Sequence, residues 1–273
     1  MKTNAALSFD EPYLNIIVGH ITTCKAYKPA FGQGKPVSLE AFQQLYGTDP
    51  FYSWFGLNDP LVYAAHRAAG GITSVYRQIG LGSEVLFRQI LQDQLGLTTG
   101  QIAWSYMSMS EGRSRRLSLD ARVNLDDIQD NAKRHGIASW LREAARRLDV
   151  APEIAAVLKG AVFEVRQGYK SKDSKRQNAD LMNAATAYSQ GYLPVLLVLS
   201  TQIDSDIVER YTHAKWLILH GNLTTSPYLS TYAFVEQIVG YDWAGFFRRN
   251  AKALQTIIAD ILKALLEPEN QDG

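Results

Sequence analysis

The chain is predicted to be an α/β protein with a central mixed β-sheet flanked by helices. Three observations predict this fold class. Residues 117–125 alternate strictly between apolar and polar side chains, which is typical of a half-buried strand. Residues 193–199 (LPVLLVL) are all apolar, which is typical of a central strand covered on both faces. Segments with helical periodicity separate these and the other predicted strands.

The first part of the chain is rich in aromatic and turn-forming residues, and short helices are predicted at 39–45 and 61–69. The segment AAGGIT at 68–73 predicts a loop, because two adjacent glycines disfavour a helix. After this loop, Ser83 is expected to cap a new helix with one apolar stripe, and Gly96 is expected to end that helix.

A pair of strands is predicted next. The segment QIAWSYMSM at 101–109 and the alternating segment are expected to pair across a turn at 111–113. The residues expected to point to one side of the second strand are Leu117, Leu119, Ala121, Val123 and Leu125. Helices are then expected over 127–159, with Pro152 at a helix start.

Residues 161–167 (AVFEVRQ) are predicted to form a strand, followed by a helix at 174–189 and the buried strand. A strand, a helix and a buried strand in this order indicate a right-handed crossover between parallel strands. The rest of the chain alternates more weakly. The predicted segments are a helix at 204–214, a strand at 215–221 and helices at 234–239 and 243–266.

The composition is that of an ordinary globular protein. Of the 273 residues, 46% are hydrophobic and 20% are charged, so a single domain over 1–273 with a sizeable core is expected. The net charge is +1, so the placement of charge is more informative than its excess. Cys24 cannot form an internal disulfide, and no run is long enough to span a bilayer. No nucleotide-binding fingerprint is present, and a soluble cytoplasmic protein is expected.

Two carboxylates are candidates for metal binding. On the 161–167 strand, Glu164 and Arg166 share one face, and Asp120 lies on the polar face of the alternating strand. If these strands are neighbours, Asp120 and Glu164 can converge, and their repulsion then requires either a cation between them or one carboxyl group that stays protonated. Carboxylate oxygens suit Mg²⁺, which acts on phosphodiesters. The alternative is structural ion pairing, of Glu164 with a base and of Asp120 with Arg122 or Arg116.

A basic run follows directly after Glu164. Between residues 166 and 176, five positive side chains stand against Asp173. Such a run is often a solvated surface, but here it leaves a buried strand and enters a helix N-terminus, which favours phosphate. Cations bind the DNA backbone, whereas Asp and Gln can read base edges. The residues expected to contact DNA are Lys170, Lys172, Asp173, Lys175, Arg176 and Gln177.

The order of elements, together with LSLDARV and FEVRQGYKSKDSKRQNAD, resembles the PD-(D/E)XK nuclease superfamily and, within it, type II restriction endonucleases. The resemblance covers about 75–200, with a helical insert at 127–159, and implies an α-β-β-β-α-β core. Residues 1–74 would be an N-terminal arm, and 201–273 would pack on the core. The resemblance implies that Asp120 and Glu164 bind Mg²⁺ and that a lysine two residues after the glutamate assists the attacking water.

The chain departs from this pattern at two positions. Leu119 stands where the family has proline, and Arg166 stands at the lysine position. Arginine stays charged and cannot act as a base, although it can stabilise charge on a phosphate. Lys170 could supply the ammonium group if the chain bends at Gly168, and Gln167 is a weaker option.

Further acids are also candidates. Glu84 matches an additional acid that some members of the superfamily carry on their first helix. The alternative is an acid stabilised by a helix N-terminus. Asp126 is a reserve ligand, or together with Asp127 it caps the next helix.

The resulting expectation is an enzyme: a type II site-specific deoxyribonuclease of a prokaryotic restriction–modification system. It would cut double-stranded DNA with Mg²⁺, as a homodimer on a symmetric site. Two alternatives stay open. One is a structure-specific repair nuclease. The other is a non-catalytic DNA-binding protein in which Arg166 records the loss of the catalytic lysine.

Overall fold

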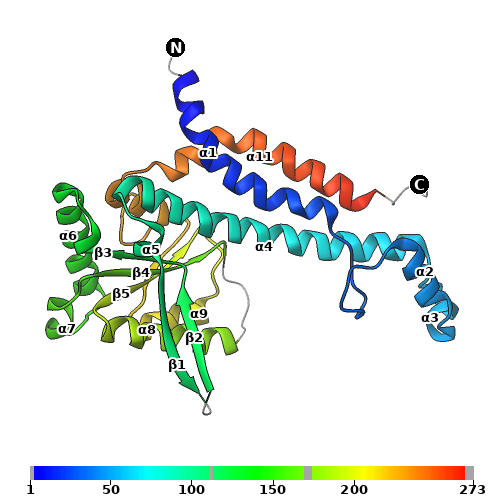
Figure 1. Ribbon diagram of the computed structural model, residues 1–273, viewed down its shortest axis with the longest axis horizontal. Coiled ribbons are helices and arrows are strands. Elements are labelled where there is room, and N and C mark those ends of the chain that lie inside the picture. The colour runs from blue at the N-terminus through cyan, green and yellow to red at the C-terminus, as the bar shows by residue number, and fades with distance from the viewer. Residues whose placement is uncertain (1–2, 111–112, 169–173, 268–273) are drawn as a thin grey trace. The chain divides into compact units, whose positions relative to one another are not determined.

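The computed structural model describes residues 3–110, 113–168 and 174–267 (Figure 1). The chain divides into two compact units. One comprises 1–82 with 249–273, and the other comprises 83–248. Two long helices, α4 (Pro60–Leu95) and α11 (Trp243–Leu266), contribute residues to both units. Each unit is described separately below.

The first unit is helical. Its other elements are α1 (Thr3–Thr22), the 3-10 turn η1 (Thr23–Ala26), α2 (Leu39–Gly47) and α3 (Pro50–Trp54). The predicted helix at 39–45 is confirmed, and it begins where the Ser38 hydroxyl accepts the Ala41 N–H. Helix α1 had no counterpart in the sequence prediction. The aromatic residues around Phe42 form a small core, with Phe31, Tyr46 and Tyr63 in ring contact with it.

Helix α4 overturns the predicted loop at 68–73. A single helix of 36 residues runs through Gly70, Gly71 and Ser83. Ser83 is therefore a buried residue in the helix interior and not an N-cap. The two glycines allow neighbouring side chains to pack closely against the helix backbone. A Cβ added at Gly71 would lie 2.6 Å from the methyl groups of Leu265, and one added at Gly70 would clash with the Tyr27 ring. The predicted end at Gly96 is confirmed, since this residue adopts a left-handed φ of 69°.

The second unit contains a four-stranded mixed sheet in the order β3-β4-β5-β6. Strand β3 (Ala121–Asn124) is antiparallel to β4 (Gly160–Arg166), and β4 is parallel to β5 (Tyr192–Val198). Strand β6 (Leu217–Leu219) continues the parallel pairing. Every residue of β5 is buried, which confirms its prediction as a central strand.

Helices cover both faces of this sheet (Figure 1). On one face, α8 (Ser174–Ser189) and α9 (Ser205–His213) bury a cluster that includes Val162 of β4. On the other face, Phe163 of β4 contacts Phe87 of α4 and Phe234 of α10 (Thr231–Phe234). The predicted α/β class with a mixed sheet and flanking helices is therefore confirmed. The remaining elements are α5 (Thr99–Ile102), η2 (Leu125–Asp127), α6 (Asn131–Arg147), α7 (Pro152–Ala156) and the π-helical turn η3 (Val235–Val239).

Strands β1 (Trp104–Ser110) and β2 (Arg113–Leu119) pair as a separate antiparallel ribbon, as predicted from the sequence. The expectation that the alternation runs unbroken from β2 into β3 is wrong. The chain bends at Asp120, so Leu119 joins the core cluster beside Val162, whereas Ala121 pairs with Phe163 of the opposite face. Asp120, which lies at the junction between β2 and β3, therefore belongs to neither strand.

Candidate active site

The bend at Asp120 brings this residue against the strand that carries Glu164. The Asp120 N–H donates to the Phe163 carbonyl at 2.9 Å, and its carboxylate Oδ2 accepts the Val165 N–H at 2.7 Å. The Asp120 carboxylate thus accepts an N–H that a backbone carbonyl of a neighbouring strand would otherwise accept. Because the Val165 nitrogen is bonded to the Glu164 carbonyl carbon, the Asp120 carboxylate lies directly against the backbone of Glu164.

Glu164 is buried, with 5% of its surface exposed. It lies near the end of β4, and the parallel strands β4 and β5 end at this same edge of the sheet. Open α/β sheets bind ligands at the carboxyl ends of their parallel strands. The Asp120 carboxylate therefore adjoins the backbone of Glu164 near this edge of the sheet.

Arg166 forms an ion pair with the Glu164 carboxylate through its Nη2. The two side chains lie two residues apart on the same face of β4, and both are largely buried. Within the described part of the chain, the buried Nε of Arg166 has no hydrogen-bond partner. A buried donor without a partner is rare in proteins, so the site lacks an acceptor at this position.

The alternative of structural ion pairing is realised for Glu164, and its partner is Arg166. The two arginines considered as partners of Asp120 also contact other residues. Arg122 forms an ion pair with Asp127 at 3.6 Å and donates to the Gln101 carbonyl at 2.9 Å. Arg116 donates through Nε to the Ser105 hydroxyl at 2.9 Å.

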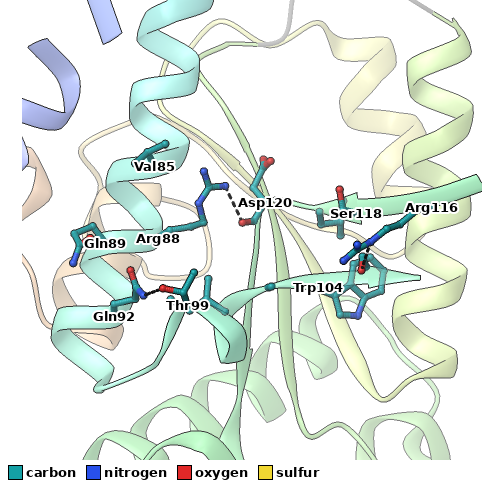
Figure 2. A pocket seen from close by; sticks show the side chains of 13 residues that line it. Val85, Arg88, Gln89, Gln92, Thr99, Trp104, Arg116, Ser118 and Asp120 are labelled. Atoms are coloured by element: carbon teal, nitrogen blue, oxygen red, sulfur yellow. Dashed lines mark hydrogen bonds between the residues drawn. The ribbon is translucent and has the colours of Figure 1, made fainter. Parts of the chain in front are cut away.

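Helix α4 contributes Glu84 and Arg88, which lie one turn apart on the same face of the helix. Arg88 donates through Nη1 to the Asp120 carbonyl at 3.2 Å (Figure 2). Glu84 lies in the interior of α4, which begins at Pro60, so its assignment to a helix N-terminus is wrong. The expectation that Asp126 and Asp127 cap the next helix is also wrong, because Asp130 caps α6 by accepting the N–H groups of Ala132 and Lys133.

A cavity of about 410 Å³ adjoins Asp120 (Figure 2). Its polar lining includes Arg88, Gln89, Gln92, Thr99, Ser105, Arg116, Ser118 and Asp120. The sequence analysis assigned no role to Arg88 or Ser118, and it considered Arg116 only as an ion-pair partner of Asp120. Two signals could have found them: Arg88 follows Glu84 by four residues on a helix, and Ser118 and Arg116 precede Asp120 by two and four residues on a strand.

The predicted DNA-contact residues fall into two groups. Lys170, Lys172 and Asp173 lie outside the described residues. Lys175, Arg176 and Gln177 belong to α8, which begins at Ser174 as predicted, but their side chains are also outside the description. The backbone before them is described, and the Gln167 carbonyl accepts the Ser200 N–H at 2.8 Å.

Among the described residues, no group of three or more His, Cys, Asp or Glu side chains is close enough to hold a metal ion. The same part of the chain contains no helix with the length and hydropathy of a membrane span. Comparison with protein-family models, curated proteins and solved structures finds no match to this chain.

Proposed function

We propose that this protein is a Mg²⁺-dependent endonuclease that cuts double-stranded DNA at specific sites, in the manner of a type II restriction enzyme. The observation that carries the proposal is the hydrogen bond from the Val165 N–H to the Asp120 carboxylate. It holds one acid against the backbone of the other, at the ligand-binding edge of a mixed sheet. Along the chain, α4 is followed by β1 and β2 of the ribbon, β3, β4, α8 and β5, so four strands, two of them in a separate ribbon, stand where the resemblance implies three.

The residues present are compatible with magnesium. Asp120 and Glu164 would hold the ion, because Mg²⁺ is commonly bound by one or two carboxylates and fills its other positions with waters and substrate phosphates. When bound, Mg²⁺ would polarise the phosphodiester and favour hydroxide at neutral pH. Glu84, which points from the same helix face as Arg88, is a further acid for this site.

Arg166 has a defined role in this proposal. It balances the charge of the buried Glu164 carboxylate near the end of β4. Its guanidinium keeps its proton, so it stabilises charge that develops on the phosphate and does not activate water. One water attacks phosphorus, the bond from phosphorus to the leaving oxygen breaks, and that oxygen gains a proton. Lys170 is proposed to supply the additional ammonium group.

The test is digestion of plasmid DNA with Mg²⁺, followed by mapping of the ends. The wild-type protein is expected to give discrete fragments, and D120N and E164Q to lose at least about a hundredfold in rate, as expected for a lost electrostatic contact to the transition state. D127N is the matched control, because Asp127 pairs with Arg122 and lies outside the proposed site. Wild-type rates in D120N and E164Q would refute the assignment, and DNA left uncut with Mg²⁺ or Mn²⁺ would refute the enzymatic function.

One observation favours a second candidate, a DNA-binding protein without catalysis. The Glu164–Arg166 ion pair already neutralises the buried acid, so the position of the family's lysine is filled by a residue that cannot act as a base. This candidate predicts tight binding to DNA that is independent of divalent ions and yields no product. The wild-type protein separates the two candidates, because a nuclease cuts the DNA that it binds when Mg²⁺ or Mn²⁺ is added, whereas a binding protein leaves that DNA intact.

The remaining parts of the proposal are a homodimer on a symmetric DNA site and a place in a prokaryotic restriction–modification system. Sedimentation of the protein with and without a cut-site duplex tests the dimer. Two protein chains per duplex are expected, since a symmetric site presents the same contacts twice.

A further inference from the structure

We propose that the cavity beside Asp120 is a binding site for a backbone phosphate of the DNA strand, next to the phosphate that is cut, with Arg116 and Arg88 as its donors. This inference rests on the proposed function, because it places duplex DNA over Asp120. It assigns binding to the β1–β2 ribbon and α4, which are other segments of the chain than the basic run at 166–176.

The cavity is built by three elements of one unit. Its walls come from α4, from α5 with the residue after it, and from the ribbon, where Ser105, Arg116 and Ser118 share one face (Figure 2). On that face, Ser105 pairs with Ser118, and the next pair along is Met107 with Arg116. The opposite face of the ribbon packs inward, where Trp104 donates to Gln190 and Tyr106 donates to Asn183. The cavity face is therefore the side of the ribbon that a ligand can reach.

Arg116 is an exposed residue whose guanidinium is oriented by one hydrogen bond and keeps further N–H donors for a ligand. Its Nε–H donates to the Ser105 hydroxyl at 2.9 Å, which holds the side chain along the ribbon. A guanidinium has five N–H donors in a planar fork, so those on its terminal nitrogens can bind two oxygens of one phosphate. An arginine held in this way is prepared for phosphate at a small cost in side-chain entropy.

Arg88 adds a second positive charge. It donates through Nη1 to the Asp120 carbonyl at 3.2 Å and so links the cavity to the candidate catalytic acid. Among the lining residues, two guanidinium groups stand against the single carboxylate of Asp120. Neutral donors and acceptors complete the lining, including the Thr99 hydroxyl, which accepts from Gln92 at 2.9 Å. An excess of guanidinium over carboxylate, surrounded by hydroxyls, is the chemistry that recognises a phosphodiester.

The shape of the ribbon favours duplex DNA over a small phosphate compound. A two-stranded antiparallel ribbon fits the major groove of B-form DNA, and its edges then face the flanking phosphates. The cavity, at about 410 Å³, is large enough for a sugar as well as its phosphate. A strand laid across it reaches Asp120 directly, so the bound phosphate is a close neighbour of the one that is cut.

The test measures binding of the full-length protein to a duplex that carries the mapped cut site, by fluorescence anisotropy in EDTA over a series of salt concentrations. R116Q is expected to weaken binding roughly tenfold, as for one lost charge-assisted hydrogen bond. It is also expected to reduce the slope of log affinity against log salt by about one phosphate contact. R116K should keep the slope and recover only part of the affinity. R142Q is the control, because Arg142 is also exposed and also bonds one serine hydroxyl, on helix α6.

A second measurement locates the phosphate. Replacing single phosphates near the cut by neutral methylphosphonates should reveal one position that weakens the wild-type protein and leaves R116Q unaffected. Wild-type affinity and salt slope in R116Q would overturn the cavity proposal while leaving the nuclease proposal intact. A wild-type protein that ignores duplex DNA but binds RNA or free phosphate through Arg116 would overturn both.

Discussion

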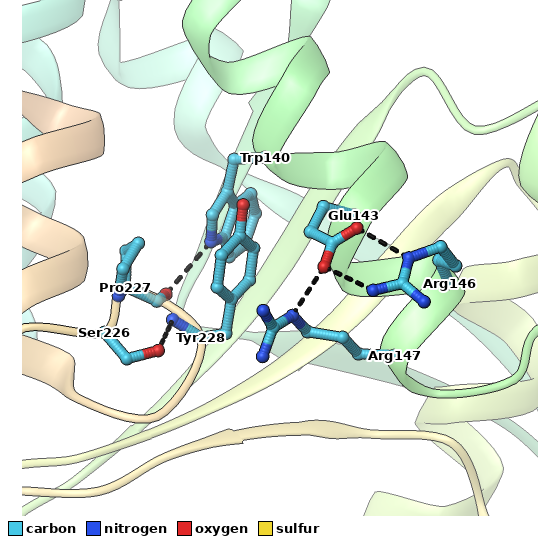
Figure 3. A network of polar contacts seen from close by, with 7 residues as sticks. All are labelled: Trp140, Glu143, Arg146, Arg147, Ser226, Pro227 and Tyr228. Carbon is cyan, nitrogen blue, oxygen red and sulfur yellow. Dashed lines mark hydrogen bonds and ion pairs between the residues drawn. The ribbon is translucent and has the colours of Figure 1, made fainter.

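Glu143 illustrates how single charged residues are fixed in this protein (Figure 3). Its carboxylate accepts the Nε–H of Arg146 at 2.7 Å and the Nε–H of Arg147 at 2.8 Å. These hydrogen bonds, with that from Arg146 the largest contribution, lower the pKa of Glu143 from 4.5 to about 2. Arg147 in turn lies over the Tyr228 ring, 4.3 Å from its centroid, so one carboxylate orients a cation that contacts a distant loop.

The pH dependence of stability should report this contact. The folded-state pKa of Glu143 is lowered, so its contribution to stability is present above about pH 4.5 and is lost as the pH falls toward 2. The difference in melting temperature between the wild-type protein and E143Q should therefore shrink over that range. Thermal unfolding followed by circular dichroism measures it. An unchanged difference from pH 5 down to 2 would contradict the assigned cause.

Helix α4 shows how packing overrides helix propensity at the scale of one element. Glycine in a helix interior is unfavourable by roughly 0.5–1 kcal/mol relative to alanine, yet α4 runs through Gly70 and Gly71. Close packing compensates for this cost, because Leu265, which is 1% exposed, occupies the space where a Cβ of residue 71 would lie. A third glycine of the same helix, Gly80, has no atom within 4 Å of its would-be Cβ.

Alanine substitutions at these two positions should therefore have opposite effects. G80A should stabilise the protein by roughly 0.5–1 kcal/mol, because it only improves helix propensity. G71A should destabilise it by about 1–3 kcal/mol through overpacking against Leu265. Urea denaturation gives both free energies of unfolding. L265A in the G71A background is the control for the mechanism, and the two changes should be less costly together than their sum. Equal effects of G71A and G80A would exclude overpacking.

For the molecule as a whole, stability is expected to be concentrated in the middle of the sheet. Strand β5 pairs with β4 on one side and β6 on the other, and helices cover both of its faces. The β1–β2 ribbon pairs only within itself in the described sheets, and several of its side chains are exposed. The candidate active site lies where these two regions meet, at the Asp120 bend.

Hydrogen exchange followed by mass spectrometry should show this gradient. Amides of Val195–Leu197 are expected to exchange slowest, because they open only when the whole unit unfolds. Amides of Trp104–Ser108 are expected to exchange earlier, by local opening. L196A should speed exchange in β5 through global destabilisation of about 2–5 kcal/mol. Equal protection of the ribbon and β5 would show that they open as one cooperative unit.

Local pattern was sufficient for much of the fold. The apolar run predicted β5, periodicity predicted α8 over 174–189, and the turn between two alternating segments predicted the ribbon. These features depend on neighbours within a few residues, so periodicity along the chain reveals them. A mixed sheet with flanking helices was predicted as a class, but the separation of the ribbon from the four-stranded sheet was not. Helix α1 was missed, since Pro12 lies inside it and its apolar pattern is weak.

The candidate site, like the fold, was predicted only in part from the sequence. The sequence alone indicated that Asp120 and Glu164 are acids within two strand-forming segments and that Arg166 shares the face of Glu164. Only the tertiary structure decided that Asp120 bends the chain to bond the Val165 amide, that Arg166 pairs with Glu164, and that Arg88 and Arg116 face one cavity. These contacts join residues far apart in the chain, and their geometry depends on strand register and helix placement. Periodicity carries no information about either, because many long-range pairings satisfy the same local pattern.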